Sequence, residues 1–204
     1  MKWNPALLMK TRFCVLPLLL ACSAIATDIP YISEITPTPV PAATPQVDSP
    51  MGPYAPFVGG VWWTSAPPDR YNREVVTQST WTWAAAGTAI IGKSYTFTGG
   101  VKSASSEASV MTVWNASKKE FVTVGSRAEF ITEATATIQD GAIVSDATVT
   151  TPEGKILRLL TRIKFTGLNT GEIRLLRLHE HETVSADKAD WSKASVFKME
   201  RHPS

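Results

Sequence analysis

From Phe57 onward the sequence is a succession of short segments in which apolar and polar residues alternate, separated by Gly, Pro, Asn and Asp. Alternation with a period of two places every second side chain on the same face of a β-strand, and helical spacing is nearly absent. We therefore predict about ten strands. They span residues 58–64, 73–83, 88–98, 105–115, 120–127, 131–139, 142–151, 155–166, 171–184 and 194–200.

The turns between these segments are short, as in Gly99-Gly100 and Asp140-Gly141. Parallel strands need crossovers of a dozen or more residues, so short turns predict an antiparallel meander. Closure removes the exposed edges of a long meander, so the fold class we expect is all-β, with a closed barrel of about 8–10 strands. One short helix is predicted at 186–193, before the last strand, with Ser185 as its N-cap.

The first 26 residues are typical of a cleavable export signal, because basic residues precede an apolar run too short to span a bilayer. Two cleavage sites compete. Ala24-Ile25-Ala26 suits ordinary signal peptidase, whereas Leu19-Leu20-Ala21-Cys22 resembles the lipobox of bacterial lipoproteins, apart from a Leu20 larger than usual. If the lipobox is used, Cys22 becomes the acylated first residue and attaches the protein to a membrane.

Residues 27–56 are rich in proline, which removes backbone donors and fixes φ. We predict that this segment is a disordered linker, able to hold residues 57–204, the barrel domain, roughly 90 Å from an anchor if extended. A long spacer favours an anchored protein, so we expect an exported protein of the cell envelope, either periplasmic or a membrane-anchored lipoprotein. The alternative is a disordered leader on a soluble protein.

Charge and cysteine content exclude several classes. The formal net charge is +2, and loss of Lys2, Lys10 and Arg12 with the signal leaves the remainder close to neutral. That is too little positive charge for nucleic-acid binding or for general adhesion to anionic lipid. Both cysteines lie in the signal, so the domain has no disulfide and is stabilised by its core.

The hairpin of 155–166 and 171–184 carries the most information about an interior. Pairing about its turn sets Phe165 opposite Ile173, Ile163 opposite Leu175, Thr161 opposite Arg177, Leu159 opposite His179 and Leu157 opposite His181. These residues share one face, apolar near the turn and polar at the far end, as expected inside a barrel packed at one end. Arg177 would then need an acidic, aromatic or anionic partner.

The candidate ligand-binding residues are the aromatic and polar side chains assigned to this interior: Trp81, Trp83, Tyr95, Arg177, His179 and His181. Aromatic rings are what a ligand-holding barrel uses for its walls, although a filled core uses them too. Two histidines make an incomplete zinc site, so no metal is predicted. No cofactor is predicted either; heme ligation by one of the pair is the weaker option that we retain.

Gly60-Val61-Trp62 is similar to the G-x-W motif that opens lipocalins and other calycins. The chain also resembles uncharacterised bacterial lipocalin-like proteins, through Trp81-Thr82-Trp83 and the stretch from Trp191 to Arg201. This resemblance implies a lipocalin-like (calycin) barrel in which Trp62 plugs the closed end and a late arginine, Arg177 or Arg201, packs on it. It also implies binding of small apolar molecules. Heme-binding barrels of the nitrobindin type are a more distant likeness.

The leading hypothesis is an envelope protein that holds a small, largely apolar ligand. A filled barrel that acts through its surface as a structural or interaction component is the second, and an enzyme the third. No catalytic motif is present, and the acids Glu107, Glu129, Glu133 and Asp146 show no spacing of a catalytic pair. No catalytic residue is predicted, and activity as an enzyme is the least favoured reading.

Overall fold

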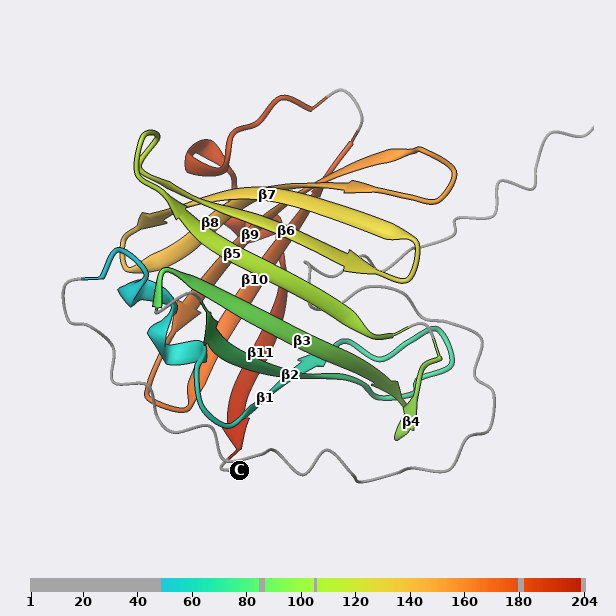
Figure 1. Ribbon diagram of the computed structural model, residues 1–204. Helices are drawn as coiled ribbons and strands as arrows, with labels where there is room; N and C mark the ends of the chain where they lie inside the picture. Colours follow the sequence, from blue (N-terminus) through green and yellow to red (C-terminus); the bar gives the residue numbers. More distant parts are fainter. Residues whose placement is uncertain (1–48, 85–86, 105, 180–181, 203–204) are drawn as a thin grey trace, which may run out of the picture.

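Successive strands pair antiparallel along the chain, and the first also pairs with the last, so that the sheet closes on itself (Figure 1). This computed structural model describes residues 49–84, 87–104, 106–179 and 182–202. The predicted signal (1–26) with Cys22, most of the predicted linker, and His181 lie outside the described residues.

The strands form a closed ring of ten, to which β4 is added as an extra strand on the end of β3. They are β1 (Val61–Ala66), β2 (Val75–Ala84), β3 (Ala89–Thr98), β4 (Val101–Lys102), β5 (Ala108–Asn115), β6 (Glu120–Arg127), β7 (Phe130–Gln139), β8 (Ala142–Thr150), β9 (Ile156–Phe165), β10 (Thr170–Leu178) and β11 (Ser195–His202). The predicted all-β antiparallel barrel is thus confirmed. None of the helices in the described part of the chain is long and apolar enough to span a membrane.

Alternation and turn chemistry explain why these segments become strands. In β5 and β7 buried and exposed residues alternate along most of the strand, so one face lines the interior. The β7–β8 hairpin turns through Asp140 and Gly141, whose φ angles are +49° and +70°. Two consecutive positive φ values match the right-handed twist of the flanking strands, which is why Asp-Gly predicted this turn.

The N-terminal end of the described chain closes one end of the barrel. A 3-10 helix, η1 (Gly52–Phe57), buries Met51, Tyr54 and Phe57; in Figure 1 it is the cyan turn beside the barrel wall. A 3-10 helix has three residues per turn, so side chains three apart lie on one face. The folded domain therefore begins before residue 57, and the last part of the predicted linker belongs to the barrel core.

The β9–β10 hairpin keeps the predicted faces but not the predicted register. Phe165 pairs with Gly171 and Ile163 with Ile173, two residues away from the expected partners. The cause is the turn, which closes through hydrogen bonds from the Thr166 and Gly167 amides to the carbonyl of Thr170. A shift of two leaves every side chain on its original face, so the interior assignment survives.

The connection between β10 and β11 holds no α-helix in its described part. Instead of one helix at 186–193 there are two 3-10 turns, η3 (Ala186–Lys188) and η4 (Trp191–Lys193). Ser185 does not cap the backbone, whereas the Asp190 carboxylate accepts a bond from the Ser192 amide and starts the second turn. Extended backbone at Ala189 separates the two turns. η3 contacts β8.

Candidate functional site

The closed end of the barrel is built around Trp62, which is 1% exposed. Its indole nitrogen donates to the carbonyl of Phe57 at 3.0 Å, and the Arg201 guanidinium lies 5.5 Å from the ring centroid. Gly60 precedes the tryptophan with φ +76°, and a Cβ there would lie 2.7 Å from the carbonyl oxygen of His202. Only glycine fits at a position with both constraints. Of the two arginines considered for this role, Arg201 is the one beside Trp62.

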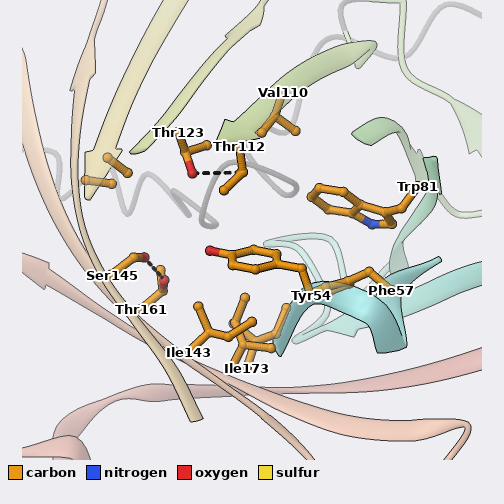
Figure 2. Close-up of a pocket in the computed structure, with 13 residues that line it drawn as sticks. Tyr54, Phe57, Trp81, Val110, Thr112, Thr123, Ile143, Ser145, Thr161 and Ile173 are labelled. Carbon is orange, nitrogen blue, oxygen red and sulfur yellow. Dashed lines mark hydrogen bonds between the residues drawn. The ribbon is translucent and has the colours of Figure 1, made fainter. Parts of the chain in front are cut away.

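Beside this plug the barrel interior holds a small, partly open cavity (Figure 2). The centre of a water molecule can occupy about 60 Å³ of it, which is room for a few waters or a ligand of few heavy atoms. Its lining comes from η1 and from the inner faces of strands around the barrel: Tyr54, Phe57, Trp81, Val110, Thr112, Thr123, Ala134, Ile143, Ser145, Ala147, Thr161, Ile163 and Ile173.

Two pairs of hydroxyl groups face each other across this cavity (Figure 2). The hydroxyls of Thr112 on β5 and Thr123 on β6 are 2.8 Å apart, and Ser145 on β8 bonds Thr161 on β9. Each pair satisfies one donor, and each oxygen keeps acceptor capacity for a further partner. The alternation of the four strands brings these hydroxyls inside, because all four side chains fall on interior positions.

The phenol of Tyr54 enters the cavity between the two hydroxyl pairs (Figure 2). The residue is 6% exposed, and its ring packs edge-on against Phe121 with centroids 4.8 Å apart. No hydrogen bond joins its hydroxyl to another described residue, although burial of an unpaired hydroxyl is costly. Burial also raises the pKa of Tyr54 above its ordinary range, so the phenol is neutral at physiological pH.

Aromatic and aliphatic side chains form the rest of the wall. The rings of Phe57 and Trp81 pack with centroids 4.9 Å apart, and the Trp81 indole nitrogen donates to Ser79 at 3.4 Å. Gly92 on β3 lies directly opposite Trp81, and a Cβ there would approach the indole to 2.6 Å. Glycine at this position therefore lets the indole lie flat against β3 and into the cavity.

The six predicted ligand-binding residues do not lie together in the structure. Trp81 lines the cavity, and Trp83 is partly buried against the core. Tyr95 lies on the outer face of β3, where the Lys102 ammonium sits 3.6 Å from its ring centroid and Glu107 accepts from its hydroxyl at 3.4 Å. The expected place of Tyr95 inside the barrel is therefore wrong.

Arg177 and His179 also lie outside the cavity. Both are exposed, because β10 ends at Leu178 and the barrel wall no longer covers them. The predicted face of the strand was correct, but the predicted depth was not. Whether these residues meet a ligand stays a prediction, as it does for His181, which lies outside the described residues.

The residues that the sequence did not single out are Tyr54 and the four cavity hydroxyls. The sequence did contain a signal for Tyr54. Met51, Tyr54 and Phe57 are spaced three residues apart in a proline-rich segment, which is the spacing of one face of a 3-10 helix. For the four hydroxyls the sequence signal was weaker: it was only that threonine and serine occupy positions whose side chains point into the barrel. Arg127, 8% exposed at the C-terminal end of β6, is a further buried polar residue that was not predicted from the sequence.

The chemistry of the lining suits recognition of a neutral molecule. Tyr54 is the one titratable residue among the described residues of the lining, which place no acid–base pair at the cavity. Nowhere in the described ranges do three or more His, Cys, Asp or Glu side chains gather closely enough to hold a metal ion. The cavity is also far smaller than a heme. What these side chains can supply is hydrogen bonding to a polar group and apolar contact around it.

In comparisons with known proteins, no family model matches this chain, and no curated protein sequence matches it significantly.

Proposed function

We propose that this protein binds a small, largely apolar molecule inside its barrel and serves in the cell envelope. The observation that carries the proposal is the Tyr54 hydroxyl, which enters the cavity without a hydrogen-bond partner among the described residues. A ligand with one polar group would satisfy this hydroxyl and the free lone pairs of the Thr112–Thr123 and Ser145–Thr161 pairs. Its apolar part would pack on Trp81 and Ile143.

The size of the cavity restricts the ligand. Pockets for drug-sized molecules measure about 300–1,000 Å³, well above the space available here. The ligand is therefore a neutral molecule of few heavy atoms, with one hydroxyl or carbonyl group and a short apolar part.

Two measurements test this proposal. Native mass spectrometry of the protein isolated from cells should reveal an added small mass. Straight-chain alcohols from ethanol to hexanol should raise the melting temperature of the apo protein, with the effect falling off once the chain outgrows the cavity. The Tyr54→Phe variant should lose much of the response. A protein that carries no extra mass and responds to none of the alcohols would contradict the proposal.

That negative outcome would favour the second candidate, a filled barrel that acts through its surface. The observation behind it is the dense interior, where Phe57, Trp62, Phe121 and Phe197 are almost fully buried. A filled barrel predicts a clean apo mass and no binding of hydrophobic dyes.

The lipocalin-like family and the envelope location are parts of the same proposal. Gly60 and Trp62 open β1 as the G-x-W motif does, and Arg201 over the Trp62 ring matches the arginine of that family. The lipid anchor is supported by the lipobox-like residues before Cys22 and by the proline-rich spacer. Replacing Cys22 by serine should release the protein from membranes into the soluble fraction, whereas unchanged fractionation would refute acylation.

A further inference from the structure

A polar groove lies on the outside of the barrel, over β9 and β10, away from the cavity. The centre of a water molecule can occupy about 210 Å³ of it. Among the residues that the structure describes, its lining combines three cations with one carboxylate: Arg162, Lys164, Arg174 and Glu172. All four side chains belong to the outer positions of two neighbouring strands, so they converge on one stretch of surface.

The pairing of these strands sets like charges against each other. Arg162 lies directly opposite Arg174, whereas Lys164 lies opposite Glu172. The Glu172 carboxylate does not neutralise Lys164, because it bonds the Arg174 guanidinium at 2.6 Å. No hydrogen bond or ion pair joins Arg162 or Lys164 to another residue in the part of the chain that the structure describes. Like charges directly opposite on adjacent strands destabilise a sheet, so this arrangement costs free energy unless an anion lies between them.

Arg174 is held in position from two sides. Its Nε donates to Glu172, and its Nη1 lies 3.4 Å from the carbonyl oxygen of Trp191, in the connection that crosses the outside of the barrel. A guanidinium fixed in this way has already lost most of its conformational freedom, so less is lost when it binds a ligand. Arg162 then supplies a second guanidinium from the facing strand.

We propose that this groove binds a phosphate group. Two guanidinium groups with an ammonium beside them match a dianionic oxyanion, because arginine presents paired donors that fit phosphate oxygens. The excess of three cations over one carboxylate favours a doubly charged phosphate over a singly charged carboxylate. The phosphate belongs either to a free phosphate or small phosphate ester, or to a phospholipid headgroup, and the two sources are separable by experiment.

The test compares Arg162→Gln with the charge-matched control Lys93→Gln, an exposed position on β3, across the barrel. Inorganic phosphate at constant ionic strength should raise the melting temperature of the native protein and of the control. The Arg162→Gln variant should bind phosphate about ten- to a hundredfold more weakly. Without phosphate it should melt at a higher temperature than the native protein, because the repulsion from Arg174 is gone. Equal phosphate affinity in both variants, or no response beyond that to chloride, would overturn the proposal.

Vesicles distinguish the source of the phosphate. If the ligand is a headgroup, vesicles that contain phosphatidic acid, whose phosphomonoester can carry two negative charges, should bind the native protein. Inorganic phosphate should compete with these vesicles, and Arg162→Gln should abolish binding. If the ligand is a free phosphate or ester, inorganic phosphate should bind while vesicles do not. Vesicle binding that is unaffected by phosphate and by the substitution, without binding of inorganic phosphate, would contradict a phosphate site. These outcomes are independent of the alcohol and mass measurements on the interior cavity.

Discussion

The Arg201 guanidinium lies 5.5 Å from the ring centroid of Trp62 and thereby joins the last strand of the barrel to the first. The same side chain donates to the Leu168 carbonyl at 2.7 Å and to the Asn169 side chain at 2.9 Å, both in the β9–β10 turn. Longer bonds of 3.4 Å reach the carbonyls of Pro56 and Val58. One arginine therefore connects the plug, the seam between the terminal strands and a neighbouring turn.

Replacing Arg201 by alanine should lower the free energy of unfolding by about 2–3 kcal/mol, because several backbone carbonyls lose their donor and the indole loses its cation. Urea denaturation followed by tryptophan fluorescence measures the change. Lys198→Ala, an exposed cation on the same strand, is the control and should shift stability by less than about 0.5 kcal/mol. Equal effects of the two substitutions would show that Arg201 is an ordinary surface residue.

Alanine substitutions at Gly59 and Gly60 distinguish the cost of backbone strain from the cost of a steric clash. Both have positive φ, at +87° and +76°, but only at Gly60 would a Cβ meet other atoms. Gly59→Ala should cost about 1 kcal/mol of stability from strain alone, and Gly60→Ala about 3 kcal/mol because the clash adds to it. Thermal melts of the two variants give the comparison. A Gly60→Ala variant as stable as Gly59→Ala would mean that the β1–β11 seam yields easily.

Tyr54→Phe should leave the free energy of unfolding unchanged within about 0.5 kcal/mol, or raise it slightly, because the lost hydroxyl has no partner in the described protein. Thr112→Val is the matched contrast. It removes a hydroxyl that does have a partner, leaves Thr123 unpaired in the interior, and should cost about 1 kcal/mol. If Tyr54→Phe proves the more damaging of the two, the phenol has a structural partner and is not available to a ligand.

Alkaline pH should destabilise the protein through Tyr54. Burial raises the pKa of Tyr54 in the folded protein, whereas in the unfolded chain it stays near its ordinary value of about 10. The stabilisation from the neutral phenol is therefore complete below about pH 10 and is lost as pH rises towards the raised pKa of the folded state. Stability measured from pH 8 to 12 should fall less steeply in Tyr54→Phe than in the native protein. The pKa of Tyr95 is also raised, first by burial and then by Glu107, but this contribution is common to both proteins.

Period-two alternation was sufficient to predict the barrel, because each strand of a closed meander must face one side inward. It also gave the inner face of β9 and β10, although the hairpin register depended on where the turn closed around Thr166 and Thr170. Depth along the barrel is not encoded in alternation. That is why Arg177 was expected inside although the wall ends beside it. The error at Tyr95 has a different cause, because this residue lies one position out of phase with the interior positions of β3.

The candidate site was less predictable than the fold. Trp81 was selected for its aromatic ring. Each hydroxyl pair joins two consecutive strands, β5 and β6 or β8 and β9, but only the closed barrel brings the two pairs to one cavity. Proline content made the segment before Phe57 look like a linker throughout. The same prolines are compatible with the 3-10 turn that carries Met51, Tyr54 and Phe57 into the core. Proline content alone therefore did not distinguish a linker from this structural element.

The pairing of β1 with β11 has a consequence for how the chain reaches its final form. Until these two strands meet, the other strands can form only an open sheet with an unpaired row of amides and carbonyls at each end. The contact between strands so distant in sequence carries a large loop-closure entropy, which slows the last step of folding. A newly made molecule is therefore most prone to associate with its neighbours just before the ring closes, and losing β11 would make that vulnerability permanent.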